Sequence, residues 1–164
     1  MMGFAAVQIA LMRGARVIAT AGETFAGPLR DFGAIVTPYG EGMVQRVREI
    51  AGGPVDLALH AALADGVLLD LIDMVGGDPR RVISISDFDE GRLGVRTTGR
   101  EPNLVPRYDA LADYADHAAQ GRFTLPTART FALEAWREAL DLAFSNRARG
   151  KVVLLPEGCP HAGL

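Results

Sequence analysis

The sequence predicts a doubly wound α/β fold, in which helices cover both faces of a parallel sheet. In the first half of the chain, short β-branched runs alternate with single helical segments. These runs are apolar on both faces, which is typical of parallel strands buried between two layers of helices. The length of 164 residues and the apolar content of 49% suffice for one domain with a buried core.

Helices are expected where Ala, Leu and Met accumulate or where apolar residues recur at helical spacing, and glycines such as Gly14 and Gly33 end them. The expected helices of the first half cover residues 4–13, 29–32, 43–50 and 67–75. The expected strands cover residues 16–20, 34–36, 55–59 and 81–85. Crossovers between parallel strands are almost always right-handed, so this order also fixes the hand of the fold.

The pattern changes after Ser86, where the sequence becomes polar and glycine-bearing. A possible edge strand, two amphipathic helices and a closing strand are expected at residues 93–97, 108–119, 133–144 and 151–155. The last nine residues are expected to fray as a tail. The sequence therefore predicts one domain over residues 1–155, followed by a C-terminal tail over residues 156–164.

The first ten residues have the character of the helix that follows a nucleotide-binding glycine turn. A dinucleotide site is built from a strand, a Gly-x-Gly-x-x-Gly turn and a helix N-terminus, because the turn lets backbone N–H groups and the helix dipole meet the pyrophosphate. In this sequence neither the strand nor the turn precedes the helix. We therefore expect a sheet that lacks its usual first strand and glycine turn, and an incomplete cofactor site.

The composition excludes several classes of partner. The net charge of −3 is small and the basic residues are dispersed, so no surface for nucleic acid is expected. No stretch approaches the roughly 20 apolar residues that a membrane-spanning helix needs, so no membrane association is expected. The lone Cys159 has no second cysteine with which to form a disulfide within the chain, which favours the reducing cytoplasm.

The order of the segments resembles the nucleotide-binding half of the medium-chain dehydrogenase/reductase superfamily. The matching stretches are GFAAVQIA (3–10), GARVIATA (14–21), LRDFGA (29–34), VRE (47–49) and RGKVVL (149–154). Residues 131–135, together with Ala139, also resemble the last helix of that family. The resemblance extends over residues 3–155 and is strongest to the NADPH:quinone oxidoreductase-like branch, a relative of the zinc-type alcohol dehydrogenases.

This resemblance implies a Rossmann-type domain whose intact relatives transfer hydride from a nicotinamide to a quinone, enone or carbonyl substrate, a small molecule. Gly3 matches the third glycine of the turn, which allows close packing of helix on strand. Lys151, in the matching closing strand, is also expected near the cofactor. The GroES-like domain, which carries much of the substrate pocket and the metal ligands of zinc-dependent members, has no counterpart here. The chain is therefore not expected to catalyse alone, and no catalytic residue is identified.

The choice between NAD and NADP depends on the end of the strand at residues 16–20. An acidic residue there would bind the ribose hydroxyls and favour NAD, but the sequence has Thr20, Ala21 and Gly22. The absence of a carboxylate favours NADPH. Arg30 is the nearest basic residue, whereas Glu23 either turns toward the ribose or is a solvated surface carboxylate.

Four further residues are expected beside the cofactor at the ends of later strands. His60 stands where the family commonly has Asp; it either bonds a ribose or donates a proton, or it is a buried neutral histidine bonded to backbone, the favoured alternative. Ala61 gives the following turn a small side chain. The loop that begins Ser86-Asp87-Phe88 would border the nicotinamide, with Ser84 and Ser86 as contacts, although loops at that edge are also polar for ordinary solvation.

No metal site is expected. Cys159 and His161 supply only two ligands in a terminal tail, whereas zinc needs three or four that converge. Two aspartate pairs on expected helices, Asp70 with Asp73 and Asp113 with Asp116, are interpreted as solvated faces.

The expected sheet has the strand order 3-2-1-4-5-6 with its first strand missing, so the strands at residues 16–20 and 55–59 lose a shared partner. The chain would then pair these strands directly, borrow a strand or remain marginally stable. We expect a homo-oligomer or a partner chain, helped by the edge strand at residues 93–97. The alternatives to an oxidoreductase domain are a non-catalytic interaction module that binds a nucleotide weakly and, less favoured, a Rossmann-like methyltransferase.

Overall fold

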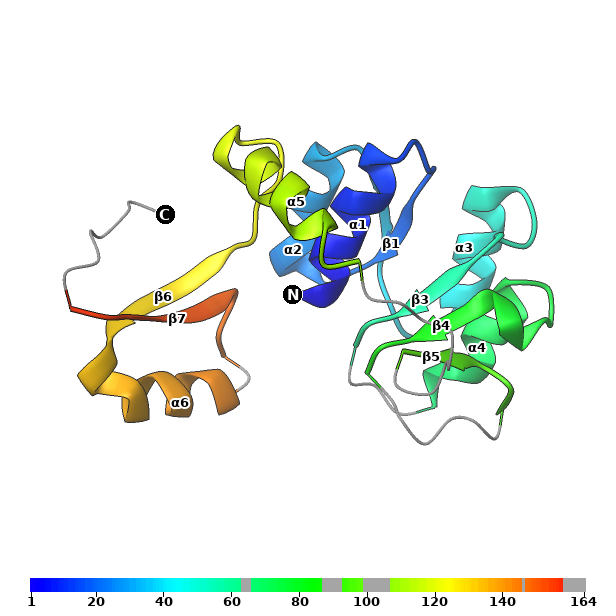
Figure 1. Ribbon diagram of the computed structural model, residues 1–164. Coiled ribbons are helices and arrows are strands. Elements are labelled where there is room, and N and C mark those ends of the chain that lie inside the picture. The colour runs from blue at the N-terminus through cyan, green and yellow to red at the C-terminus, as the bar shows by residue number, and fades with distance from the viewer. Residues whose placement is uncertain (63–65, 87–92, 99–106, 146, 158–164) are drawn as a thin grey trace. The chain divides into compact units, whose positions relative to one another are not determined.

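The computed structural model describes residues 1–62, 66–86, 93–98, 107–145 and 147–157 (Figure 1). The chain divides into two compact units, Met2–Asp113 and Tyr114–Leu164, the second of which also includes Met1. Within the described ranges, no helix combines the length and apolar character needed to cross a membrane. The single domain over residues 1–155 and its tail stay predictions.

In the first unit, helices and strands alternate as the sequence predicts. In chain order the elements are α1 (Met2–Met12), β1 (Ile18–Thr20), α2 (Glu23–Asp31), β2 (Ile35–Thr37), α3 (Met43–Ala51), β3 (Ala58–His60), α4 (Val67–Met74), the 3-10 turn η1 (Pro79–Arg81), β4 (Val82–Ser84) and β5 (Arg96–Thr97). The helix α2 begins six residues before the expected start, and Pro28 lies inside it. The alternation confirms the predicted α/β class.

All the described strand pairs of this unit are parallel. β1 pairs with β2, so that Thr20 lies opposite Thr37. In a second, three-stranded sheet, β3 pairs with β4 and β4 with β5, so that His60 lies opposite Ser84. β1 and β3 are in separate sheets, so the direct pairing that would close the expected sheet does not occur.

Two of the packing arrangements that hold the first unit together involve helices α1 and α3. Phe4 of α1 is buried and makes edge-to-face contacts with Phe25 and Phe32, at ring distances of 5.8 and 5.6 Å. Burial of such a side chain stabilises a domain by roughly 1.5–3 kcal/mol. Between α3 and α4, the buried cluster of Met43, Val47 and Met74 is packed against Ile18 of β1 and Val55, which precedes β3. The two sheets therefore share one core although their strands do not pair.

The second unit contains a parallel pair of strands with a helical crossover. α5 (Ala110–Ala119) extends across the boundary between the units, and β6 (Thr127–Ala132), the 3-10 turn η3 (Leu133–Ala135), α6 (Trp136–Phe144) and β7 (Lys151–Leu155) follow it. Phe131 of β6 and Ala139 of α6 are its buried apolar residues. The last helix does not begin at Phe131, as the resemblance suggested, because Phe131 and Ala132 belong to β6.

A glycine fixes the start of β7. The backbone N–H of Lys151 donates to the Pro126 carbonyl over 2.7 Å, which brings the two strands together at their beginnings. A Cβ atom on Gly150 would collide with that carbonyl oxygen, so no larger residue fits at this position. The matched RGK stretch is therefore explained in part by backbone packing.

Candidate functional site

A pocket of about 490 Å³ lies at the carboxyl ends of β1 and β2. It is lined by the segment after β1, by one side of α2 and by the segment that continues β2. Ala21 and Gly22 line it directly, and Thr20 precedes them as the exposed last residue of β1. The Ala21 N–H donates to the Thr37 carbonyl over 3.1 Å, which extends the β1–β2 pairing to the rim of the pocket.

The pocket carries one basic and one acidic side chain from α2. Arg30 lies in the last turn of the helix and Glu23 in the first, and both are exposed. Each charge also suits the helix dipole, which favours acids at the N-terminus and bases at the C-terminus. Tyr39 is 68% exposed, and its ring lies 3.5 Å from where a Cβ atom of Gly22 would be. An open, charged pocket with an aromatic wall is the result.

A different arrangement occupies the carboxyl ends of β3 and β4. The His60 side chain is buried, with Nδ1 3.1 Å from the Ser84 Oγ and 3.3 Å from the Ser86 Oγ. The Ser86 hydroxyl donates to the Ala62 carbonyl over 2.8 Å. The structure thus brings together three of the predicted residues, and Nδ1 of the His60 ring lies within hydrogen-bond distance of two side-chain hydroxyls. Their contact with a cofactor stays a prediction.

Gly3 and Ala61 meet at the start of α1. A Cβ atom on Gly3 would lie 3.4 Å from the Cβ of Ala61, in ordinary contact. Two small residues therefore let the N-terminus of α1 approach the turn after β3. The role that the resemblance implies for Gly3, close packing of the helix on a strand at a cofactor site, stays a prediction.

The other predicted site residues lie in the second unit or outside the described residues. Lys151 is the exposed first residue of β7, in the second unit, and its part in a cofactor site stays a prediction. Asp87, Phe88, Cys159 and His161 lie outside the described residues. Within the described part of the chain, no three His, Cys, Asp or Glu side chains lie together so that they could hold a metal ion.

Sequence reasoning missed Tyr39 and Arg46. Tyr39 follows a parallel strand at its carboxyl end, a position that the rule for ligand sites in α/β folds would have marked. Arg46 lies on α3, and its guanidinium bonds the segment between β2 and α3. No sequence motif marks such a bond, because it depends on how the loop turns back onto the helix.

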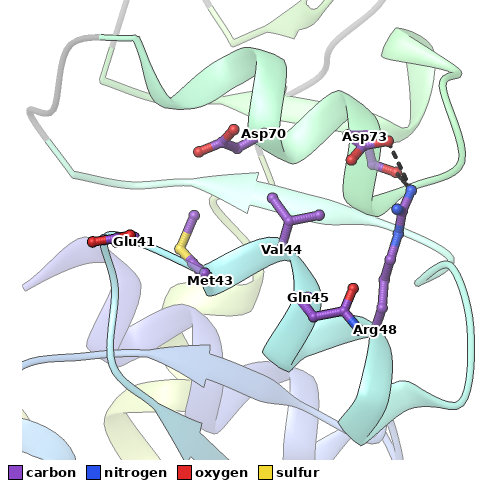
Figure 2. Close-up of a pocket in the computed structure, with 9 residues that line it drawn as sticks. Glu41, Met43, Val44, Gln45, Arg48, Asp70 and Asp73 are labelled. Atoms are coloured by element: carbon purple, nitrogen blue, oxygen red, sulfur yellow. Dashed lines mark hydrogen bonds and ion pairs between the residues drawn. The ribbon is translucent and has the colours of Figure 1, made fainter.

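A second pocket, of about 430 Å³, lies between α3 and α4 (Figure 2). Figure 2 shows the ion pair that crosses it, in which Arg48 Nη2 lies 2.7 Å from Asp73 Oδ1. Arg48 also donates to the Asp73 carbonyl over 2.8 Å. Asp70 and Asp73 are both exposed, as predicted for a solvated face, although Asp73 is paired. None of the predicted cofactor residues lines this pocket.

Parallel strands that alternate with helices, with a pocket at the carboxyl ends of β1 and β2, are typical of a Rossmann-type fold. The model of the zinc-binding dehydrogenase family matches residues 32–154, and the chain belongs to that family. This result confirms the predicted membership of the medium-chain dehydrogenase/reductase superfamily, whose members are oxidoreductases that use nicotinamide cofactors.

Solved structures of related proteins have the same fold. An NAD-dependent alcohol dehydrogenase is 24% identical, with a TM-score of 0.69, and the match covers 92% of this chain and 47% of that one. A quinone oxidoreductase from Pseudomonas syringae is 24% identical, with a TM-score of 0.68 and coverages of 94% and 53%. A probable oxidoreductase from Mycobacterium abscessus is 28% identical, with a TM-score of 0.62 and coverages of 94% and 51%. The chain thus spans about half the length of these proteins, and no curated protein matches it.

Proposed function

We propose that this chain is the nucleotide-binding part of an NADPH-dependent oxidoreductase, whose complete form transfers hydride to a quinone, enone or carbonyl substrate. The pocket at the ends of β1 and β2 carries this proposal, because it combines Arg30 with a strand end that has no carboxylate. The nicotinamide supplies the hydride chemistry when bound, and the chain supplies binding and orientation. Catalysis by the chain alone is not part of the proposal.

The adenosine end fits a nucleotide that carries a 2'-phosphate. Thr20 at the end of β1 presents no negative charge to repel such a phosphate. Arg30 offers a planar guanidinium that can form two hydrogen bonds with phosphate oxygens. Glu23 lines the same pocket and would oppose the phosphate, but it is exposed and sits where a carboxylate stabilises the start of α2.

The ends of β3 and β4 fit the other half of the nucleotide. Ser86 gives its hydroxyl proton to the Ala62 carbonyl, so toward His60 Nδ1 it can only accept a hydrogen bond. The contacts of Nδ1 with the two hydroxyls hold the His60 ring in a fixed orientation. Ser84, buried beside the ring, restricts it further. We propose that Ala61 and these three side chains form the wall that faces the ribose and nicotinamide.

Zinc chemistry forms no part of the proposal. The family name implies a zinc ion, and the described residues supply no cluster of three ligands that would hold one. No step is therefore assigned to a metal.

Calorimetric titration of the chain with NADPH and NADH tests the function. We expect NADPH to bind, with a dissociation constant above the low micromolar range, and to bind more tightly than NADH. In a protein that begins at Met1, the pyrophosphate would meet the N-terminus of α1 without a glycine turn, so we expect the binding to be weak. A complete lack of binding to both nucleotides would contradict the proposal.

A non-catalytic interaction module is the second candidate. The separation of β1 and β3 into different sheets favours it, because a partner strand would pair with both. Tight binding of NADPH would exclude this candidate, whereas capture of a partner without any nucleotide binding would support it.

We propose that the chain acts in the cytoplasm, because its single cysteine is typical of a reducing compartment. We also propose that it assembles with a copy of itself. β5 pairs with β4 on one side, and no described strand pairs with its other side. Two such edges can pair across a two-fold axis. Sedimentation at dilute concentration checks this: a monodisperse monomer with an ordinary cooperative melt would contradict the need for a partner.

A further inference from the structure

One guanidinium holds the segment between β2 and α3 at three points. Arg46 donates from Nε to the Thr37 Oγ1 over 3.1 Å, from Nη2 to the Pro38 carbonyl over 2.8 Å, and from Nη1 to the Glu41 carbonyl over 2.7 Å. The first two acceptors immediately precede Tyr39, and the third follows it by two residues. The arginine therefore fixes the backbone on both sides of the aromatic wall of the pocket.

The local structure is built around this guanidinium. Gly42 has a φ of +72°, which favours glycine, and a Cβ atom there would lie 2.9 Å from Arg46 Nη1. The Thr37 side chain is buried, so its hydroxyl has little access to water as an alternative partner. Lysine could not reproduce the three bonds, because its ammonium is a single point rather than a planar fork.

The charge of Arg46 is poorly placed for the helix that carries it. Arg46 is the fourth residue of α3, in a first turn that contains no acidic residue. A positive charge at this end opposes the helix dipole. Stabilisation of α3 therefore does not explain an arginine here, whereas its three bonds to the preceding segment do.

We propose that Arg46 is a positioning residue for the adenosine end of the nucleotide. It holds Pro38 and Tyr39 as a fixed wall opposite Arg30, so that the pocket keeps its shape before the nucleotide enters. This inference rests on the proposed function, because the wall belongs to the pocket assigned to the 2'-phosphate and ribose. Arg46 itself does not line that pocket and acts through the segment it holds.

The test measures binding of adenosine 2',5'-bisphosphate, a probe for this end alone, by calorimetry. We expect Arg46→Gln and Arg46→Lys to weaken binding about tenfold, since a loose wall must be ordered when the probe binds. Arg48→Gln is the matched control: Arg48 lies two residues away on α3, but its guanidinium bonds the carbonyl and the carboxylate of Asp73 on α4. This control should keep the affinity of the unaltered chain, even if it lowers the melting temperature.

A spectroscopic readout separates positioning from a general loss of structure. In chain labelled with 3-fluorotyrosine, the ¹⁹F resonance of Tyr39, assigned with Tyr39→Phe, should broaden or shift in the Arg46 variants. The resonances of Tyr108 and Tyr114 should not change.

Each outcome decides the proposal. Unchanged affinity and an unchanged Tyr39 resonance in both Arg46 variants would overturn the inference and leave the proposed function intact. Absence of probe binding by the unaltered chain would overturn both. Loss of cooperative unfolding in both Arg46 variants would make Arg46 a residue of the folding core and would also overturn its positioning role.

Discussion

The two strand-end regions of the first unit differ in the burial of their polar side chains. At the ends of β1 and β2, Arg30 and Tyr39 are exposed around an open pocket. At the ends of β3 and β4, His60 and Ser84 are buried and bonded to each other. An exposed pocket exchanges water for a charged ligand at little cost, whereas a buried network must be satisfied within the protein before any ligand arrives.

Because of this difference, substitutions in the two regions should affect different properties, namely nucleotide affinity in one and the stability of the fold in the other. Changes in the exposed region should alter nucleotide binding and leave the fold almost unaffected. Changes in the buried region should first destabilise the fold, because they leave cavities and hydroxyls without a ring to bond. Four substitutions test this division.

The largest effect is expected from His60→Ala. The change removes a buried ring and leaves the Ser84 and Ser86 hydroxyls without that partner, so the free energy of unfolding should fall by roughly 2–4 kcal/mol. Urea unfolding followed by circular dichroism measures it; fluorescence is unsuitable because the single tryptophan, Trp136, lies in the second unit. A loss below about 1 kcal/mol would contradict the importance of this network.

The next effect concerns selectivity. Thr20→Asp places a carboxylate at the end of β1, where it would repel a 2'-phosphate and accept hydrogen bonds from ribose hydroxyls. The preference for NADPH over NADH should reverse or disappear, a change of about tenfold or more in the ratio of dissociation constants. Thr20→Asn, which has the same shape without the charge, is the control. Unchanged selectivity in the aspartate variant would show that Thr20 is not beside the adenosine ribose.

A smaller effect is expected from Arg30→Gln. Because the Arg30 side chain is exposed, its attraction to a phosphate is screened by water, and we expect NADPH binding to weaken only about fivefold. NADH binding and the melting temperature should stay the same. An equal loss for both nucleotides would show that Arg30 does not recognise the 2'-phosphate.

The sequence predicted most of this fold because the information was local. The spacing of apolar residues predicted α3 except for its last residue, and the β-branched run predicted both ends of β7. The strand β6 was missed because its sequence, TARTFA, has neither a continuous apolar run nor a regular alternation of polar and apolar residues, and it leads directly into a helical turn. Its parallel pairing with β7 depends on Gly150, whose tight contact with Pro126 no sequence pattern reveals.

The sequence also predicted where several residues of the candidate site lie, and their contact with a cofactor stays a prediction. The rule that ligands bind at the carboxyl ends of parallel strands located Ala21, Gly22, His60 and Ser84. The contact of Gly3 with Ala61 was not predicted, because it joins two segments that lie far apart in the sequence. The bonds of Arg46 could not be predicted, because they join a helix to the loop before it through geometry that three separate acceptors define.

The smallest effect is expected at an exposed ion pair, Asp78 with Arg80, in the turn that precedes β4. Asp78 accepts from the Arg80 backbone N–H over 3.1 Å and from the Arg80 Nε over 2.9 Å. The side-chain hydrogen bond from Arg80 is the main cause that lowers the pKa of Asp78 below its ordinary value of 3.8. The unfolded chain therefore binds this proton more readily, and the stabilisation is present above pH 3.8 and lost as the pH falls through the lowered pKa.

We expect Asp78→Asn to lower the melting temperature by only about 1–2 °C at pH 7, because water and salt screen an exposed pair. The difference between the two proteins should shrink as the pH approaches 3 and the Asp78 carboxyl is protonated. Added salt should reduce it at neutral pH, while the effect of His60→Ala should persist, because the groups around His60 are buried. Thermal melts across pH 3–7 at low and high salt measure how the melting temperatures depend on pH and on salt. If Asp78→Asn destabilised the protein as much as His60→Ala, and if added salt did not reduce that loss of stability, exposed and buried polar groups would not differ in this unit.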